Sequence, residues 1–554
     1  MAEAIYTKNT VVNIDINEFQ PRLGRYVIYQ SLEAQKRHVS SIPFSSSPYS
    51  LYSLFNKTLV KMQKYQLLCI LFVTFGSIFY GYDSGCTTSV LAYTSFIEYF
   101  NLDATTIGAF GSAYYGGGAV GCFLNYYLPD KYGRLRTIQL SCVIALIGSA
   151  MQAGASNFPV FCTGRVLTGI GTGIIFSVCP TYASEIATPE IRGRVGSLYA
   201  FNVNFAYMLT EWMGLGFYYI KGNAAWRTLL AIQLVPASFM LIASFWMPFS
   251  PRWLIMKGRE EEALEVLRKL HAGVEGHEED FYIKEFHQIK TQYQIDKANK
   301  LGLVAIFKKK SYRKRMYLIL LFVSFCQFTG IIPLQNYQVT IYTKLGFTNV
   351  FSLVLTGIWG TLGCLSTITA SQIVDRMGRR HLMFVSYSFM IPGGILLVAL
   401  WASFEATNST NYAIGKAVIF GMFFYGFGYG GFMNTFFPTY CTEIMPTNIR
   451  ATGTASGYAL FNLIVIMLVQ VTPMAIEAIS WKYFMIFVIC DIIFIVIFVI
   501  FYPETKNKTL EEISAIFGDE IAETLEEAGQ HVDEVLHEHE KAVHHIDEVP
   551  VKSA

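Results

Sequence analysis

Four ionisable side chains lie within long apolar stretches of this sequence: Asp83, Arg165, Glu211 and Asp491. A charge at the centre of a membrane-spanning helix costs about 2.5–3.5 kcal/mol on insertion scales, so each of the four requires an explanation. A carboxyl group beside a guanidinium is subject to two opposing effects, desolvation and attraction to the cation. A water path that opens and closes would change the balance between them, which is what reversible proton binding requires.

Asp83 and Arg165 are expected at similar depths in two different helices. Asp83 ends the segment 79–83, well past the middle of its apolar stretch, and Arg165 begins the segment 165–171 near the matching end of another stretch. We predict a buried pair in which Asp83 binds and releases a proton. The alternative is a static ion pair that only orients two helices. Glu211 and Asp491 are each compatible with a local polar contact or a water-facing position.

No other constellation in the sequence indicates enzyme or metal chemistry. The 10 cysteines and 10 histidines form no C-x-x-C or C-x-x-H pair, and all the histidines lie outside the apolar stretches. A net charge of +2 provides no basic field of the kind that binds nucleic acid. We therefore expect no enzyme activity, no metal, no nucleic-acid partner and no cofactor other than the proton as coupling ion.

The elements that must hold these side chains are apolar helices. Of the 554 residues, 53% are hydrophobic and 15% are charged, whereas soluble domains have about 25% charged residues. Stretches of the roughly 20 residues needed to cross a bilayer occur in two groups of six, near 66–86, 106–128, 137–155, 158–180, 195–219 and 228–247, and near 316–336, 351–373, 382–403, 416–441, 452–476 and 483–502. We predict an all-α membrane protein with twelve transmembrane helices in two six-helix bundles.

The charge of the short loops predicts the orientation, because basic loops remain in the cytoplasm. The loops after even-numbered stretches are the more basic, so both termini are expected inside. The predicted parts are an N-terminal cytoplasmic tail (1–65), an N-terminal bundle (66–247), a cytoplasmic helical linker (248–315), a C-terminal bundle (316–502) and an acidic C-terminal tail (503–554).

A repeat relates the two groups of stretches. The loop motif 130–134 returns at 375–379, and the pair after the fourth stretch returns after the tenth. The acidic and basic members of these motifs are Asp130, Arg134, Glu185, Arg192, Asp375, Arg379, Glu443 and Arg450. Two half-copies in the same orientation are typical of a two-bundle transporter. We predict that these groups pair across the seam between the bundles in one state and separate in the other, as a cytoplasmic gate; the alternative is that the arginines only enforce orientation.

The repeated loop motifs resemble those of the major facilitator superfamily. Within it, segments 248–254 and 503–512 resemble the P-E-S-P-R-W-L and P-E-T-K-G-x-[ST]-L-E-E motifs of the sugar porter family, and of its fungal members in particular, although Phe249 replaces the first Glu. The resemblance covers roughly residues 65–517. It implies alternating access, and the Asp83 and Arg165 positions match those of proton-coupled members.

The expected substrate site departs from the family pattern. The family's hexose-binding glutamine, asparagine and tryptophan positions are here occupied by Ala200, Ile332 and Pro438, and only Gln327 is kept. The candidate substrate-binding amides are Gln327, Asn204, Gln335, Asn336, Asn434 and Asn462. Each could instead hydrogen-bond a neighbouring helix. A disaccharide, glycoside or polyol is therefore expected rather than an ordinary hexose.

These observations predict a proton-coupled symporter of a sugar or related polyhydroxylated solute. We expect it to be a monomer in the lipid bilayer of the plasma membrane. Three alternatives remain open: a facilitative sugar uniporter, a carrier of a non-sugar solute, and a transporter-like sugar sensor.

The predicted orientation can be tested by glycosylation. The sequon at Asn408 lies in a predicted outside loop, whereas those at Asn56 and Asn507 lie inside. We expect a glycosidase to shift the mobility of the wild-type protein but not of Asn408→Gln. Glycan on Asn507 would show that the predicted orientation is reversed.

Overall fold

The structure is a computed structural model that describes residues 64–187, 189–271, 281–298, 309–373, 377–407, 411–445, 450–505 and 516–518. These residues all belong to one compact unit, residues 61–554. Asp375 and the predicted glycosylation site Asn408 lie outside the described residues. The side chains of Arg192, Glu443 and Arg450 also lie outside them.

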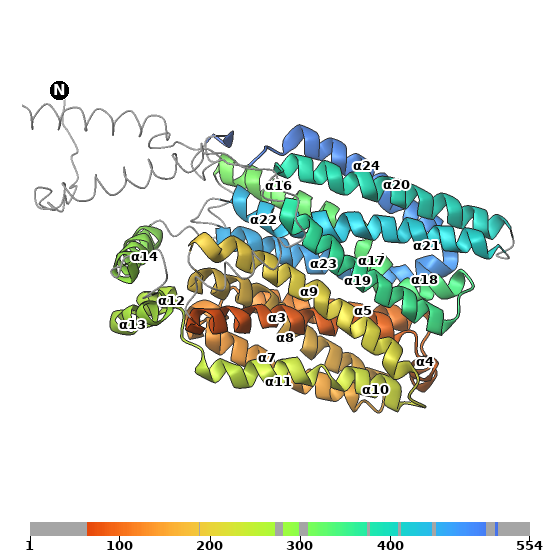
Figure 1. The fold of residues 1–554 in the computed structure, drawn as a ribbon, viewed down its shortest axis with the longest axis horizontal. Helices are drawn as coiled ribbons and strands as arrows, with labels where there is room; N and C mark the ends of the chain where they lie inside the picture. The colour runs from red at the N-terminus through yellow and green to blue at the C-terminus, as the bar shows by residue number, and fades with distance from the viewer. Residues whose placement is uncertain are drawn as a thin grey trace, which may run out of the picture. The chain divides into compact units, whose positions relative to one another are not determined.

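The N-terminal half contains the first six predicted spans, coloured red to yellow-green in Figure 1. Its helices are α3 (Lys64–Val90), α4 (Thr94–Phe100), α5 (Ala104–Leu124), α6 (Leu128–Tyr132), α7 (Arg134–Ala153), α8 (Phe158–Ile186), α9 (Pro189–Tyr218), α10 (Ala224–Ala231), α11 (Leu234–Ala243) and the 3₁₀ turn η2 (Ser244–Trp246). The sixth span is continuous through the last three elements. The short helices α4 and α6 connect spans.

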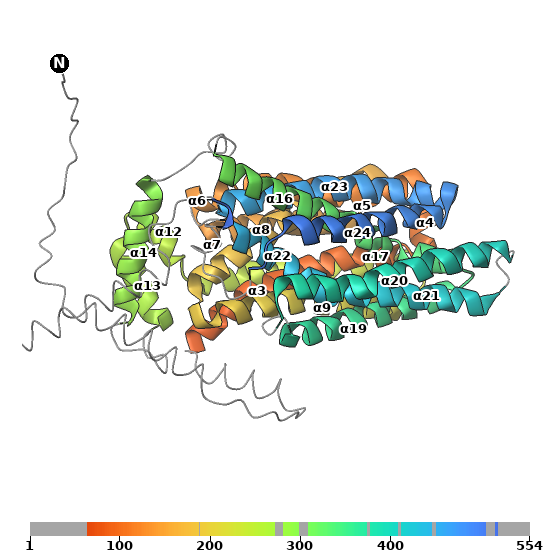
Figure 2. The ribbon, with the colours of Figure 1, turned by 90° about the horizontal axis from the view of Figure 1, so that it is seen from above.

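Three helices follow in the predicted linker: α12 (Pro251–Met256), α13 (Glu260–His271) and α14 (Phe281–Ala298). They share a small apolar core that includes Trp253, Leu267 and Phe286. Figures 1 and 2 show them beyond one end of the long helices. Trp253 Nε1 donates to the Asp130 carbonyl at 3.2 Å, and His271 Nε2 lies 2.9 Å from the Ile186 carbonyl. We call the end of the long helices next to α12, α13 and α14 the linker end, and the opposite end the far end.

The C-terminal half contains the remaining six predicted spans. Its elements are α16 (Lys310–Gln327), α17 (Ile331–Asn336), α18 (Gln338–Lys344), α19 (Asn349–Ile373), α20 (Arg379–Ala406), α21 (Tyr412–Phe427), the π-helical turn η3 (Gly428–Met433), α22 (Asn434–Ile444), α23 (Arg450–Ile479) and α24 (Lys482–Phe501). Span 7 is broken at Gly330, whose φ of +74° is in the left-handed region that favours glycine. Span 10 is interrupted by η3.

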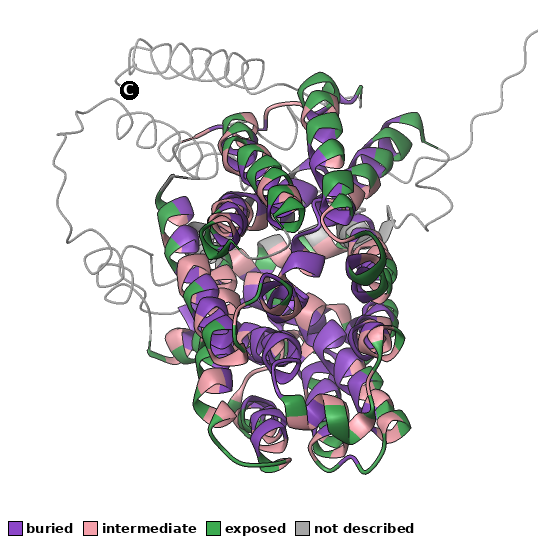
Figure 3. Ribbon diagram, turned by 90° about the vertical axis from the view of Figure 1, so that its right-hand side faces the viewer, coloured by how far each residue is buried: buried purple, intermediate pink, exposed green. Residues whose placement is uncertain are grey.

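Nine helical segments of the described chain are long and apolar enough to cross a membrane. The other three predicted spans correspond to α5, α9 and the α21–η3–α22 helix. Of these, α5 is rich in glycine and α9 carries Asn202, Asn204 and Glu211. Large apolar side chains also remain exposed on the outer faces, such as Phe245, Phe420 and Ile500. Figure 3 shows the buried residues turned inward between the helices. An apolar exterior of this kind suits a lipid environment.

Two helix pairs join the halves. α5 of the N-terminal half packs on α23, and α9 packs on α19. Within the N-terminal half, α5 and α8 approach so closely that a Cβ added at Gly117 would lie 2.1 Å from the Val166 carbonyl oxygen. Small residues at such crossings allow two backbones to approach in a membrane.

This crossing provides a stability test with a control in the adjacent residue. Gly117→Ala should force α5 and α8 apart, with a loss of about 1–3 kcal/mol from overpacking, because the clash is with backbone. Gly116→Ala should be tolerated, because nothing lies within 4 Å of its added Cβ. Thermal unfolding of the two purified variants measures the difference, and equal midpoints would contradict the close approach of these two helices.

Candidate functional site

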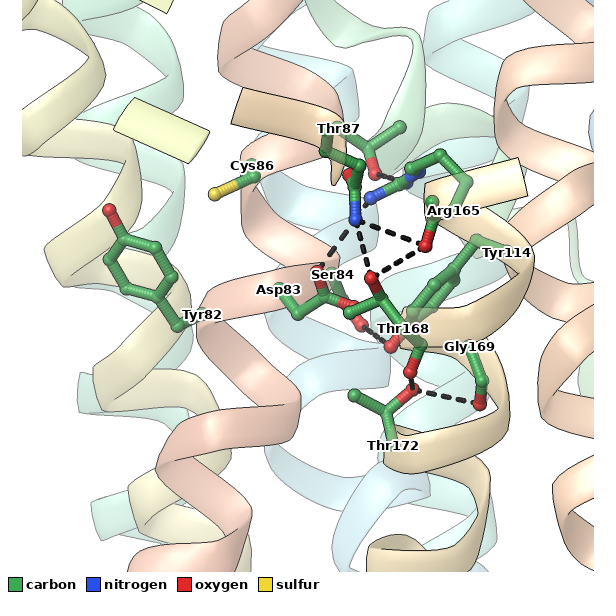
Figure 4. Close-up of polar contacts among 12 residues, drawn as sticks. Tyr82, Asp83, Ser84, Cys86, Thr87, Tyr114, Arg165, Thr168, Gly169 and Thr172 are labelled. Carbon is green, nitrogen blue, oxygen red and sulfur yellow. Dashed lines mark hydrogen bonds and ion pairs between the residues drawn. The ribbon is translucent and has the colours of Figure 1, made fainter. Parts of the chain in front are cut away.

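Asp83 and Arg165 face each other between α3 and α8, as Figure 4 shows. Arg165 Nη1 lies 3.8 Å from Asp83 Oδ1, and both side chains are fully buried. The predicted juxtaposition is therefore present. The distance is longer than a hydrogen bond, so the contact is a loose ion pair.

Arg165 has partners besides Asp83. Its Nη2 donates to Thr87 Oγ1 at 2.5 Å, and its guanidinium lies 4.7 Å from the Phe110 ring centroid and 4.8 Å from that of Tyr114. Cation–π contacts with two desolvated rings help to hold a buried guanidinium. The cation is thus fixed by groups that do not depend on the charge of Asp83.

Asp83 is poorly satisfied by comparison. Neither of its carboxylate oxygens has a hydrogen-bond partner among the described residues. The nearby Tyr114 hydroxyl lies 3.1 Å from Ser84 Oγ, and either of these two hydroxyl groups could be the donor. An ionised carboxylate that is buried without hydrogen bonds loses much of its hydration energy, and one distant cation does not restore it. The arrangement favours a group that can take up a proton.

Polar contacts cross the seam between the halves from the middle of the molecule towards the far end. Ser112 Oγ donates to Gln470 Oε1 at 2.7 Å and Trp212 Nε1 to Thr361 Oγ1 at 3.0 Å. Gln338 Nε2 donates to Glu211 Oε1 at 3.3 Å. These bonds join α5 to α23, α9 to α19 and α9 to α18. They hold the halves together at the far end, and they must break for that end to open.

Among the predicted substrate-binding amides, Gln327 has the clearest capacity for a ligand. Its side chain is only 1% exposed, and neither Oε1 nor Nε2 has a hydrogen-bond partner among the described residues. It is the last residue of α16, directly before the break at Gly330. A buried amide normally satisfies both its donor and its acceptor. A polyhydroxylated solute offers hydroxyl groups that can do both.

The other predicted amides differ from Gln327, since three of them make seam contacts. Asn204 Nδ2 donates to Thr367 Oγ1 at 2.6 Å, Asn336 Nδ2 to the Tyr115 hydroxyl at 3.4 Å, and Asn462 Nδ2 to Cys122 Sγ at 3.6 Å. Gln335 and Asn434 are only half-buried. Thr88 Oγ1 donates to the Gln335 carbonyl at 3.1 Å, which is another bond between the halves.

The motif residues at the linker end form a cluster within the N-terminal half. Arg134 lies 3.0 Å from Glu185 Oε1 and 3.3 Å from Asp130 Oδ1. Ser250 Oγ, at the start of α12, donates to Glu185 Oε2 at 2.5 Å. In this conformation Asp130, Arg134 and Glu185 pair with one another on adjacent elements of one bundle, and they tie α12 to α7 and α8. Their pairing across the seam in another state stays a prediction.

In the C-terminal half, Glu504 lies against the first residues of α20. The backbone N–H groups of Arg379 and Arg380 donate to the two carboxylate oxygens of Glu504 at 2.8 and 2.9 Å, so Glu504 caps the start of α20. A carboxylate at a helix N-terminus satisfies unpaired N–H groups and the helix dipole. Phe249 occupies the matching place after span 6, where it stacks on Trp253 with ring centroids 5.4 Å apart.

Two acids that the sequence left without a role have defined partners in the structure. Glu211 belongs to the seam, and Asp491 contacts Tyr425 at 2.9 Å. Their position inside apolar stretches was the only signal in the sequence, because their partners lie 127 and 66 residues away. Among the described residues, no group of three or more His, Cys, Asp or Glu side chains is placed to hold a metal ion.

Two helical halves are joined by two helix pairs, and a buried acid–base pair lies between α3 and α8. This architecture is that of a major facilitator transporter. The chain belongs to the sugar (and other) transporter family, whose model matches residues 69–517. It is accordingly a multi-pass membrane transporter and not an enzyme.

Comparisons with individual proteins agree with this assignment. The chain is 28% identical to the MFS-type transporter criB of Aspergillus cristatus, covering 82% of this chain and 93% of that protein. It is 29% identical to a high-affinity glucose transporter of Kluyveromyces lactis, covering 80% and 83%. In fold it is similar to the xylose transporter XylE from E. coli in a partially occluded inward-open conformation, with a TM-score of 0.69, 22% identity and coverage of 81% and 100%.

The unpartnered amide can be tested by truncation. Gln327→Ala should weaken substrate binding by about 1–3 kcal/mol, the cost of removing a buried polar partner. The half-saturation constant for uptake measures this loss. Gln139→Ala is the control, because Gln139 hydrogen-bonds Ser244 within the N-terminal half and away from the seam. Unchanged half-saturation in Gln327→Ala would move the substrate away from span 7.

Proposed function

We propose that this protein is a proton-coupled symporter of a sugar or a related polyhydroxylated solute, working by alternating access. The observation that carries the proposal is the buried pair of Asp83 and Arg165, in which neither carboxylate oxygen has a hydrogen-bond partner among the described residues. Protonation of Asp83 removes the charge that the closed interior solvates poorly.

Coupling follows if water reaches Asp83 in one state and not in another. With the far end open, water hydrates the carboxyl group and allows it to exchange a proton. With the far end closed, as here, Asp83 is fully buried, so its negative charge is costly and uptake of a proton removes that cost. Arg165 remains fixed by Thr87 and two aromatic rings, and it can promote release of the proton once the opposite path opens.

A sugar or polyol suits the unpartnered amide of Gln327 and the aromatic residues of the seam. Tyr80, Phe176 and Tyr458 form a chain of ring contacts, with centroid distances of 4.5 and 5.3 Å, that runs from α3 through α8 to α23. Aromatic faces and amides are the groups that recognise sugar rings and hydroxyls. The relatives named as glucose transporters support the same class.

The departures from the family's hexose pattern favour a larger or more reduced solute over an ordinary hexose. Ala200, Ile332 and Pro438 cannot provide the hydrogen bonds or the indole face of that pattern. Asn204, Asn336 and Asn462 are engaged in seam contacts, whereas both amide atoms of the buried Gln327 lack a hydrogen-bond partner among the described residues. A carrier of a non-sugar solute is the second candidate, favoured by these same apolar replacements.

We place the protein in the plasma membrane as a monomer, with the linker end and both termini in the cytoplasm. The basic loops at 131–136 and 192–194 support this orientation through the positive-inside rule.

Replacing the acid with its neutral isostere tests coupling. Asp83→Asn removes the titrating group and preserves the size of the side chain, so uphill accumulation driven by a pH gradient should be abolished while counterflow exchange survives. Both are measured on the same membranes, normalised to the surface amount of protein. The substrate for these measurements is found first, by screening uptake of labelled sugars, disaccharides and polyols by the wild-type protein.

Asp103→Asn is the matched control. Asp103 is an exposed N-cap of α5 that accepts from the Thr106 N–H, and asparagine is an equally good cap. This variant should accumulate substrate as the wild type does. Undiminished accumulation in Asp83→Asn would leave the pair of Asp83 and Arg165 as a structural strut.

A further inference from the structure

Asp491 is a second buried acid, in the half of the molecule opposite to Asp83. It lies on α24 and is 1% exposed. The titratable side chains near it are Cys326 of α16, Tyr387 of α20, Tyr425 of α21, Tyr429 of η3 and Cys490 of α24 itself. α23 also packs on α24 and contributes none among its described residues. Among the described residues, no cation is paired with Asp491.

The hydrogen bonds around Tyr425 depend on the protonation state of Asp491. The Tyr425 hydroxyl oxygen lies 2.5 Å from the Thr329 carbonyl oxygen and 2.9 Å from Asp491 Oδ2. A phenol has one proton to donate, and a backbone carbonyl can only accept. Both contacts can be hydrogen bonds at the same time only if the carboxyl group is protonated and donates to the Tyr425 oxygen.

Two arrangements follow from this count of protons. With Asp491 protonated, its O–H donates to Tyr425 and the Tyr425 O–H donates to the Thr329 carbonyl. With Asp491 ionised, the single phenol proton is drawn to the carboxylate, because hydrogen bonds to charged acceptors are the stronger ones. The Thr329 carbonyl then loses its partner. The proton on Asp491 thus decides whether Tyr425 holds Thr329.

Thr329 is located where span 7 breaks. It lies between α16, which ends at Gln327, and α17, which begins after Gly330. α24 braces this break at a second point, because a Cβ added at Gly330 would lie 2.3 Å from the Phe487 ring. Phe487 is one helical turn from Asp491, so α24 contacts Gly330 directly and reaches the Thr329 carbonyl through Tyr425 of α21.

The hinge connects to the far end of the seam. α17 and α18 carry three residues that bond the N-terminal half: Gln335 with Thr88, Asn336 with Tyr115 and Gln338 with Glu211. A change in the backbone at Thr329 and Gly330 therefore acts on the segment that closes the far end. It also lies two residues from the unpartnered amide of Gln327.

We propose that Asp491 is a second proton-binding site of the transporter, and that its proton sets the clamp between Tyr425 and the Thr329 carbonyl at the break in span 7. The claim that Asp491 controls transport rests on the proposed function, whereas the claim that its proton sets the clamp does not. Asp83 drives coupling in the N-terminal half, and Asp491 controls the hinge of the C-terminal half.

Three variants separate the groups. Asp491→Asn places an amide donor next to Tyr425 and keeps the clamp set at every pH. Tyr425→Phe removes the clamp at every pH. Tyr387→Phe is the control, because the Tyr387 hydroxyl is buried near Asp491 but makes no hydrogen bond among the described residues.

The first measurement needs no substrate. Hydrogen–deuterium exchange of peptides covering 328–336 is followed in purified protein as a function of pH, after correction for the intrinsic exchange rate. Wild type and Tyr387→Phe should show a pH-dependent change in protection. At every pH, Asp491→Asn should show the protection that the wild type shows at low pH. Tyr425→Phe should show at every pH the protection that the wild type shows at high pH. A wild-type protection without pH dependence, or a titration that persists in either variant, would overturn the proposal.

The second measurement links the clamp to transport. Equilibrium exchange of substrate, with the same pH on both sides, is compared in Asp83→Asn and in the double variant Asp83→Asn/Asp491→Asn. Exchange in the single variant should still change with pH, and exchange in the double variant should not. An identical pH profile in both would refute the control of transport by Asp491. Failure of uphill coupling in the wild type would instead refute the proposed function and leave the protection result standing.

Discussion

The energetic difficulty of holding a charge where no hydrogen bond can reach it is the constraint on which this structure depends. Arg165 meets it in part, by lying against two aromatic rings and a threonine hydroxyl, while its Nε and Nη1 have no hydrogen-bond partner among the described residues. Asp83 does not meet it, because both of its oxygens lack hydrogen-bond partners among the described residues. A fixed cation therefore lies beside an acid whose charge the surrounding side chains solvate poorly.

Close packing of backbone supports this constraint. α5 and α8 meet at Gly117 and Gly169, where an added Cβ on either would lie 2.1 Å from a carbonyl oxygen of the other helix. Such contacts fix the register of α8, and therefore the depth of Arg165, relative to the neighbouring helices. Span 7 instead breaks at Gly330, which allows α17 and α18 to follow a course different from that of α16. The molecule thus combines a rigid crossing beside the pair with a hinge beside Gln327.

The two halves share a pattern of motifs but differ in detail. Tyr182 and Tyr440 both donate to the carbonyl of the proline that follows the last span of their half, Pro248 and Pro503. The next residue differs: Glu504 caps α20, whereas Phe249 stacks on Trp253 of the linker helices. In the N-terminal half, the place of the capping carboxylate is therefore taken by an aromatic ring that packs against α12. The repeat therefore keeps the geometry of the loops while each half attaches to a different neighbour.

The sequence alone determined the helical class, the two-fold repeat and the family, because apolar length and loop motifs are local properties of the chain. It predicted the juxtaposition of Asp83 with Arg165 from their similar depth in two helices and from the family resemblance. It did not determine the partners of Glu211 and Asp491, the pairing of Arg134 within one bundle, or which amides remain free. Gln327 and Asn336 are both amides in span 7 and look equally suited to bind a substrate in the sequence, yet only Asn336 hydrogen-bonds a hydroxyl across the seam. Those outcomes depend on which helix faces lie together, and the contacts that decide this are made by residues distant in sequence.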